Sequence, residues 1–158
     1  MIFTTKAEYG VRLLIQLGRH GNGHPVSLKA MADAENLPLA YLERIAALLK
    51  KAGLVTSVRG AHGGYVLAAP PEDITMDRVV LALEGAIAPM ECFVDDVQGD
   101  GRVQCSHHTD ADGTCATKLL WTRVQLGVIA SLQRTTLAEL VAFQLKDVTP
   151  TPLPLPTS

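Results

Sequence analysis

The 158-residue sequence lacks the marks of a membrane protein, a secreted protein and an enzyme. No apolar stretch is long enough to span a bilayer, and residues 1–6 do not have the pattern of a signal peptide. Three cysteines are too few, and odd in number, for a disulfide scaffold. The sequence also has no serine–histidine–aspartate arrangement, phosphate-binding loop or paired carboxylates in an apolar setting. We therefore expect a cytoplasmic protein with reduced thiols, no membrane contact and no catalytic site.

Aromatic residues and long runs of charge are scarce as well, although 47% of the residues are hydrophobic. This balance is typical of a folded chain, and the length suits one small domain with an appended element. The net charge of −2 is unevenly distributed: residues 1–70 carry eight Lys and Arg against four Asp and Glu, and the remainder is acidic. Nucleic-acid binding requires cations only where phosphates lie, so the first half is where we expect DNA to bind.

The first half of the chain predicts three helices in close succession. A capping box at residues 5–8 opens a first helix, whose apolar residues follow at helical spacing until the region 18–23. Ser27 is placed to cap a second helix that runs to about Glu35. Pro38 is well placed as the first residue of a third helix.

The third helix has one apolar face and one face of small and basic residues. The apolar face carries Leu39, Leu42, Ile45, Ala46 and Leu49. The opposite face and its flanks carry the candidate DNA-binding residues Ala40, Tyr41, Glu43, Arg44, Lys50 and Lys51. Small residues permit close approach to a groove, and long basic residues donate to phosphates and base edges. This pattern is typical of a recognition helix.

Gly53 ends the third helix, and the alternation of residues 54–67 predicts a β-hairpin with a glycine-rich turn. Arg59 and His62 lie in this turn, where they are placed to enter a minor groove or to contact phosphate. Gly63 lets the tip approach a DNA backbone closely. Three helices followed by a hairpin form a winged helix-turn-helix. The sequence thus predicts a mainly α fold with a small β-hairpin wing.

Beyond the hairpin, the pattern predicts three more helices and a tail. A short helix at 76–84 is capped by Thr75 and ends at Gly85. A long amphipathic helix runs through residues 119–132, and another capping box opens a last short helix at Thr136. A lone helix this apolar needs a partner. Residues 149–158 have four prolines and no periodicity, so we expect a disordered tail.

Three cysteines lie in the most polar stretch of the chain, between the short and the long helix. Cys92, Cys105 and Cys115 are separated by twelve and nine residues and are surrounded by Asp, Gly and His. A loop of this composition cannot pack by itself, and thiolates are soft ligands that suit iron–sulfur clusters and zinc. Three interpretations remain open: a cluster of 2Fe-2S or 4Fe-4S type, zinc, or a metal-free thiol switch. His107, His108 or a loop aspartate are candidates for a fourth ligand.

Several motifs occur in order along residues 1 to about 143. They include Thr4-Thr5-Lys6, Tyr9-Gly10, Tyr41-Leu42-Glu43, Ala52-Gly53-Leu54-Val55, Leu83-Glu84-Gly85, Leu119-Leu120-Trp121, Thr135-Thr136-Leu137 and, above all, Ser57-Val58-Arg59-Gly60-Ala61-His62-Gly63-Gly64-Tyr65. Together they resemble the bacterial winged-helix regulator family typified by IscR, NsrR and CymR. The resemblance implies a homodimer on pseudo-palindromic promoter DNA, with the long helix crossing its twin. In many members a cluster senses iron–sulfur status, nitric oxide or redox stress.

The resemblance also bears on the fourth ligand. Related proteins can use an acidic residue donated by the other subunit at the position that matches Glu8, whose alternative role is in the capping box. Where some members have a histidine after the last cysteine, this sequence has Lys118, which cannot bind a metal while charged. The first gap between cysteines is also longer than is usual in cluster-binding members. Some members lack cysteines altogether. Loss of a cluster would free the first helix and tilt both winged helices.

These features predict a homodimeric transcriptional repressor whose DNA affinity is controlled by an iron–sulfur cluster. The predicted segments are a winged-helix DNA-binding domain at 1–70, a connecting helix at 71–91, a sensor loop at 92–115, a dimerisation helix and short terminal helix at 116–148, and the tail at 149–158. Arg44, Lys50 and Lys51 are expected on phosphates, and Tyr41, Glu43 and Arg59 on base edges. The alternatives are a cluster-free regulator controlled by a partner protein or by thiol oxidation, and an iron–sulfur carrier or electron-transfer protein that retains a winged helix.

Overall fold

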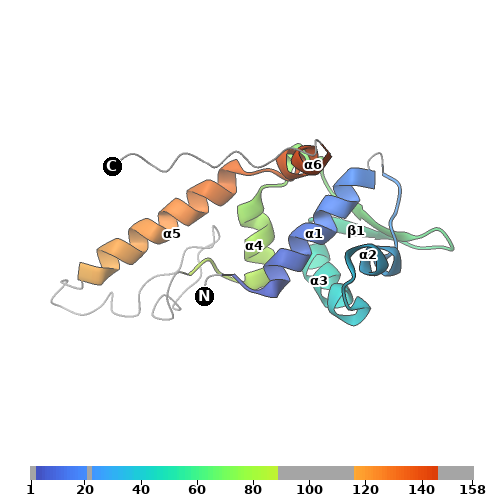
Figure 1. The fold of residues 1–158 in the computed structure, drawn as a ribbon, viewed down its shortest axis with the longest axis horizontal. Helices are drawn as coiled ribbons and strands as arrows, with labels where there is room; N and C mark the ends of the chain where they lie inside the picture. Colours follow the sequence, from blue (N-terminus) through green and yellow to red (C-terminus); the bar gives the residue numbers. More distant parts are fainter. Residues whose placement is uncertain (1–2, 21–22, 89–115, 146–158) are drawn as a thin grey trace.

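Six α-helices, one short 3-10 helix and one antiparallel hairpin make up the described parts of the chain, residues 3–20, 23–88 and 116–145 (Figure 1). In this computed structural model the order is α1 (Thr5–His20), α2 (Leu28–Glu35), α3 (Leu39–Lys51), β1 (Val55–Val58), β2 (Gly64–Leu67), η1 (Pro71–Asp73), α4 (Met76–Glu84), α5 (Ala116–Arg134) and α6 (Leu137–Leu145). β1 and β2 pair from Val55 opposite Leu67 to Val58 opposite Gly64. The predicted mainly α fold with a hairpin wing is confirmed. The predicted sensor loop and tail lie outside the described residues.

Two predicted helix caps are confirmed. The Ser27 hydroxyl oxygen accepts a hydrogen bond from the Ala30 N–H at 3.1 Å, at the start of α2. The Thr136 hydroxyl accepts from the Glu139 N–H at 3.3 Å, at the start of α6. α2 ends at Asn36, whose left-handed conformation (φ 53°) turns the chain toward α3. Local side-chain chemistry therefore fixes these helix ends.

Two other predicted helix starts are wrong in detail, and a third is correct in position. At α1, Thr4 stands before the helix and its hydroxyl accepts from the Lys6 N–H at 3.2 Å. The acidic partner of the predicted capping box, Glu8, therefore falls one position too far along, because the box joins the cap residue to the third helical residue. Pro38 occupies the cap position before α3 rather than its first turn. The predicted start of α4 is correct, since Thr75 occupies its cap position and Gly85 ends the helix, although the Thr75 side chain makes no capping hydrogen bond.

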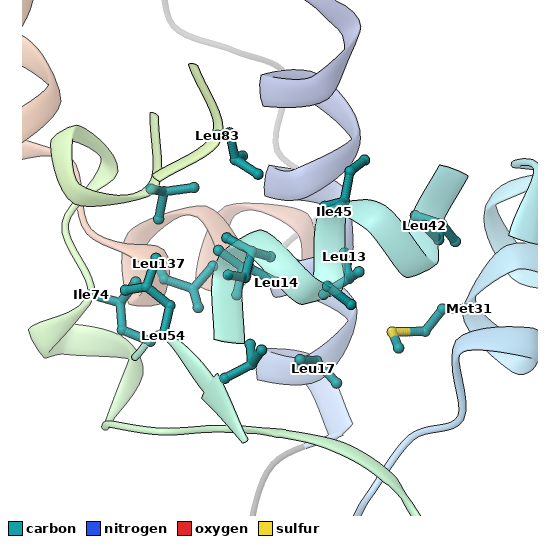
Figure 2. Packing of buried hydrophobic residues seen from close by; sticks show 14 of the residues in the cluster. Leu13, Leu14, Leu17, Met31, Leu42, Ile45, Leu54, Ile74, Leu83 and Leu137 are labelled. Carbon is teal, nitrogen blue, oxygen red and sulfur yellow. The ribbon is translucent and has the colours of Figure 1, made fainter. Parts of the chain in front are cut away.

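The core lies where α1, α3, α4 and α6 meet the start of the hairpin (Figure 2). Its large buried side chains include Leu13, Leu14, Met31, Leu42, Ile45, Leu49, Leu54, Ile74, Val79 and Leu137. Each fully buried aliphatic side chain contributes about 1.5–3 kcal/mol to folding. Because Leu42, Ile45 and Leu49 fill this core from one side of α3, the opposite side of that helix is left to solvent.

α4 and α6 pack closely against α1 at two glycines. A Cβ atom at Gly10 would collide with the side chain of Leu83 on α4. A Cβ atom at Gly18 would lie 2.7 Å from Cγ2 of Val141 on α6. Backbones approach this closely only where no side chain intervenes, so α1 is held tightly between these two helices. The core consequently extends beyond the hairpin and includes residues of α4 and α6.

α5 extends away from the other elements (Figure 1) and buries little of its surface within the chain. Gln125 and Ile129 are its buried residues, whereas Leu119, Leu120 and Leu126 are 59%, 52% and 44% exposed. Among the described residues, no helix combines the length and the apolar character needed to cross a membrane. The exposed leucines of α5 are unusual for a helix that would stay without a partner.

Candidate nucleic-acid interface

α3 presents a continuous exposed face because its other face fills the core. Leu42, Ile45, Ala46 and Leu49 are at most 1% exposed. Leu39, which the sequence placed with them, is instead 38% exposed, since it is the first residue of the helix. Burial along the rest of the helix fixes its rotation about its own axis. The side that faces solvent is thereby determined before any ligand binds.

The DNA-binding residues predicted on α3 gather on this exposed side, with one exception. Those that are exposed are Ala40, Glu43, Arg44, Lys50 and Lys51. Arg44 and Lys51 lie two helical turns apart on the same line of the helix, and the small residue Ala47 lies exposed between them. A major groove admits an α-helix whose surface carries such long donors between small residues. The geometry thus suits contacts to phosphates and to base edges.

Tyr41 is the exception, because it is only partly exposed. Its ring packs edge-on against the ring of Tyr9 on α1, with centroids 5.7 Å apart and an interplanar angle of 87°. Edge-to-face pairs of this kind are favourable beyond the area that they bury. The contact fixes the Tyr41 ring, and so the direction of its hydroxyl group, before any nucleic acid binds.

Lys50 connects α3 to the hairpin. Its ammonium Nζ donates a hydrogen bond to Oγ of Ser57 on β1 at 2.7 Å, and both residues are exposed. The sequence reasoning missed Ser57. The strand alternation was the available signal, because Ser57 shares one face of β1 with the buried Val55. The bond joins α3 to the wing.

Arg59 and His62 are exposed at the tip of the hairpin, beyond the last paired residues. Gly60, with φ +123°, and Gly63 form the turn: the Gly63 N–H donates to the Gly60 carbonyl oxygen at 3.0 Å. A Cβ atom at Gly63 would collide with the carbonyl oxygen of Val58. Gly63 is therefore required by the turn itself, whatever contact it makes with DNA. The turn leaves Arg59 and His62 as the accessible polar groups of the tip.

The base of the wing is tied to the loop between α1 and α2. Val26 and Tyr65 exchange both of their backbone hydrogen bonds, at 3.0 and 2.9 Å. The neighbouring Gly64 permits this approach, since a Cβ atom there would collide with the Val26 carbonyl group. The wing is thus held at its base by the α1–α2 loop and at its side by Lys50 of α3.

Glu8, the fourth metal ligand suggested by resemblance, lies on the surface of α1. Its side chain is 58% exposed and its carboxylate accepts a hydrogen bond from Nε of Arg12 at 2.8 Å. Arg12 also approaches the carboxylate of Glu35 on α2 at 3.8 Å, and the Gln16 side-chain amide donates to the same carboxylate. Glu8 is therefore accessible from outside the subunit and belongs to a small polar network between α1 and α2.

The other predicted metal ligands, Cys92, Cys105 and Cys115, lie outside the described residues, as do His107 and His108. Within the described ranges, no three His, Cys, Asp or Glu side chains gather into a group able to hold a metal ion. The described structure thus brings together the predicted DNA-binding residues of α3 and the wing, and among the predicted metal ligands it describes Glu8.

The sequence is similar over most of its length to known transcriptional regulators. Residues 3–143 match the Rrf2 family, described as an iron-dependent transcriptional regulator. Protein rrf2 of Nitratidesulfovibrio vulgaris is 38% identical over 141 residues, which cover 89% of this chain and 87% of that protein. The HTH-type transcriptional regulator CymR of Bacillus subtilis is 38% identical over 144 residues, which cover 90% of this chain and 91% of CymR.

Solved structures agree with the sequence comparison. CymR, the global cysteine regulator of B. subtilis, superimposes with a TM-score of 0.72 at 35% identity, covering 90% of this chain and 98% of CymR. IscR of T. potens superimposes with a TM-score of 0.69 at 31% identity, covering 95% of this chain and 94% of IscR. Together with the exposed basic face of α3, these matches define a DNA-binding transcriptional regulator rather than an enzyme. The chain belongs to the Rrf2 family.

Proposed function

We propose that the protein is a cytoplasmic repressor that binds double-stranded promoter DNA as a homodimer. The observation that carries this proposal is the exposed row of cations on α3 beside a wing whose tip carries Arg59 and His62. α3 enters the major groove, and the wing tip contacts the adjacent minor groove or its phosphates. The proposed phosphate contacts are Arg44, Lys50 and Lys51, the proposed base contacts are Tyr41, Glu43 and Arg59, and Ala40 and Gly63 allow close approach.

The homodimer is supported by the exposed apolar surface of α5. Leu119, Leu120 and Leu126 face solvent in the isolated chain. Packing against the same helix of a second copy would remove this surface from water and close a two-fold interface. Two-fold symmetry then presents two α3 helices about 34–36 Å apart, one turn of DNA, and calls for a pseudo-palindromic site.

We further propose that Cys92, Cys105 and Cys115 hold an iron–sulfur cluster, with Glu8 of the other subunit as the fourth ligand. Thiolates are the usual donors to such clusters, and zinc is the alternative metal that they suit. The surroundings of Glu8 fit this role, because its carboxylate is exposed and its partner Arg12 is an exposed side chain that exchanges easily. When bound, a cluster supplies iron that reacts with oxidants and nitric oxide, and its presence would set the affinity for DNA.

A regulator without a cluster is the second candidate, and the similarity to CymR favours it as much as the similarity to IscR favours the first. In that case a partner protein, or oxidation of the three thiols, controls DNA binding. The exposed cations of α3 and the wing favour either regulator over an iron–sulfur carrier.

Anaerobic purification followed by absorption and Mössbauer spectroscopy tests the cluster. We expect coloured, iron-containing protein. Colourless, iron-free protein would contradict the cluster and leave a zinc site or the cluster-free regulator. Glu8→Gln is expected to change the spectrum or to shorten the lifetime of the cluster. Arg12→Gln is the matched control, since it removes the same ion pair and keeps the carboxylate. An unchanged spectrum in Glu8→Gln would remove Glu8 from the ligand set.

DNA binding is tested with a duplex that the wild-type protein selects from a random pool, compared with a scrambled duplex of the same length. We expect preference for the selected duplex and an affinity that falls steeply with salt, because several phosphates are neutralised. A protein that binds neither duplex would contradict the proposed function.

A further inference from the structure

We propose that Lys50 and Ser57 form a single preorganised binding site for one phosphate of the DNA backbone. This site lies at the junction of the recognition helix and the wing. The inference rests on the proposed DNA-binding function and deepens it, because it gives Ser57 two roles: it donates to the phosphate and it positions Lys50.

The position of the pair follows from how β1 leaves α3. α3 ends at Lys51, and Leu54 is buried only three residues later, so the first strand starts directly beside the last turn of the helix. Successive side chains of a strand point to opposite faces. Val55 is buried toward the core, and Ser57 therefore points to the same side, where Lys50 Nζ lies 2.7 Å from its Oγ.

The hydrogen-bonding groups of the pair match an oxyanion. A lysine ammonium has three N–H donors, of which one is directed at Ser57 Oγ in this structure. Because Ser57 accepts that bond, its own O–H remains available to donate. Among the described residues, no carboxylate lies within ion-pair distance of Lys50. The pair thus offers adjacent donors and an uncompensated positive charge to solvent, as phosphate binding requires.

The groove geometry brings a phosphate to this place. A winged helix inserts its recognition helix into the major groove and its wing into or beside the adjacent minor groove. The DNA strand that separates those two grooves must then pass over the junction of helix and wing. Lys50 and Ser57 bridge that junction, since one lies on α3 and the other on β1.

Preorganisation is what distinguishes this pair from the neighbouring lysine. An exposed lysine side chain loses rotamer freedom when it binds a phosphate. The bond to Ser57 fixes Lys50 in the free protein, so less freedom remains to be lost on binding DNA. Lys51 is exposed one residue further along α3 and provides the comparison on the same helix.

The test is a double-mutant cycle of Lys50→Met and Ser57→Ala, read by fluorescence anisotropy on the selected and the scrambled duplex across a salt series. Lys50→Met is expected to weaken binding about tenfold and to lower the salt slope by about one, the signature of one lost phosphate contact. Ser57→Ala is expected to weaken binding about threefold with an unchanged salt slope, because no charge is removed. Each variant should lose the same factor of affinity on the selected duplex as on the scrambled one, since a phosphate contact carries no sequence information.

The coupling is the decisive readout. The double variant is expected to bind only slightly more weakly than Lys50→Met alone, by less than the threefold loss of Ser57→Ala in the wild-type background. In Lys50→Met, Ser57 no longer positions a lysine and keeps only its own bond to the phosphate. Thr56→Ala is the matched control, since Thr56 is an exposed hydroxyl on the opposite face of β1. This variant should bind DNA as the wild-type protein does and should show no coupling to Lys50→Met. Lys51→Met should lose affinity without any coupling to Ser57.

Three results would overturn the inference. The first is additive losses for Lys50→Met and Ser57→Ala, and the second is an equal loss in Thr56→Ala. The third is a loss of DNA affinity in Ser57→Ala that comes with a lower melting temperature and disappears when binding is measured at a lower temperature. That result would show that the contact only stabilises the fold. If wild-type protein binds DNA and the cycle is additive, the proposed function stands and only the paired site fails. If wild-type protein binds neither duplex, both fail.

Discussion

Arg59, at the tip of the wing, is the residue best placed to read sequence rather than charge. It is exposed and lies beyond the paired strands, and arginine can donate two parallel bonds to a guanine edge or enter a narrow minor groove. We predict that Arg59→Ala lowers affinity for the selected duplex by about 1–3 kcal/mol and lowers it much less for the scrambled one. Anisotropy titrations on both duplexes measure the difference. Equal losses of affinity on the two duplexes would show that Arg59 contacts the phosphate backbone of the DNA and not the bases.

Glu35 links α2 to α1, because its carboxylate accepts a hydrogen bond from the buried amide of Gln16. The Gln16 side chain is buried on α1 and its amide donates to the Glu35 carboxylate on α2. Glu35→Ala leaves that amide without this acceptor, so we expect a loss of about 1–3 kcal/mol in the free energy of unfolding by urea. Asp33→Ala is the control, because Asp33 is exposed on the same helix. A comparable loss in Asp33→Ala would show that α2 responds to any lost charge.

Residues found from sequence and residues missed by it differ in the range of their interactions. The exposed position of Arg44 and Lys51 is predicted correctly because helical periodicity places them opposite Leu42 and Ile45, and periodicity is a local property. Ser57 was missed because its partner lies on another element. The same holds for Glu35, whose partner Gln16 is nineteen residues away in sequence. Pairing of this kind is decided by tertiary packing, which the order of residue types does not encode directly.

At the scale of elements, the attachment of α5 depends on a buried amide. Gln125 is 3% exposed and donates to the carbonyl oxygen of Ile87 at 2.8 Å. Gln125→Leu keeps the volume but removes that donor, and we expect a loss of about 1–3 kcal/mol in the free energy of unfolding by urea. Gln133→Leu, on the exposed side of the same helix, should change that free energy by less than about 0.5 kcal/mol. Equal losses of stability in the two variants would contradict the role of the Gln125 hydrogen bond in holding α5.

Helix boundaries show how a distant contact decides between local alternatives. Thr4 and Thr5 are both suitable cap residues, and the sequence pattern favoured Thr5. In the structure the amide and the hydroxyl of Thr4 both donate to Oε1 of Glu84, at 3.0 and 2.6 Å. Glu84 is the last residue of α4. That contact holds Thr4 outside α1 as its cap. Ser27 and Thr136 were predicted correctly because no competing hydroxyl stands beside Ser27, and the Thr136 bond to Glu139 is local.

At the scale of the whole molecule, the apolar residues of α5 were predicted to pack against a partner. The sequence pattern alone does not distinguish cover by other elements of the same chain from cover by a second copy. The described structure gives the intrachain part of the answer. Ile129 is buried against Val80 and Ile87 of the same chain, whereas Leu119, Leu120 and Leu126 are exposed. An apolar stripe reads the same in sequence whether it is covered within a chain or between two chains.

The exposed leucines of α5 therefore lead to a prediction about assembly. We predict that the double variant Leu119→Gln, Leu120→Gln sediments as a monomer where the wild-type protein sediments as a dimer, because each substitution replaces apolar surface with amide. A monomer binds one half-site at a time, so affinity for a duplex with two half-sites should fall by about 10²–10⁴-fold. Val58→Thr is the control for sedimentation, since Val58 is 41% exposed on β1, away from α5. A double variant that remains dimeric, or a wild-type protein that is monomeric when bound to the duplex, would contradict assembly through α5.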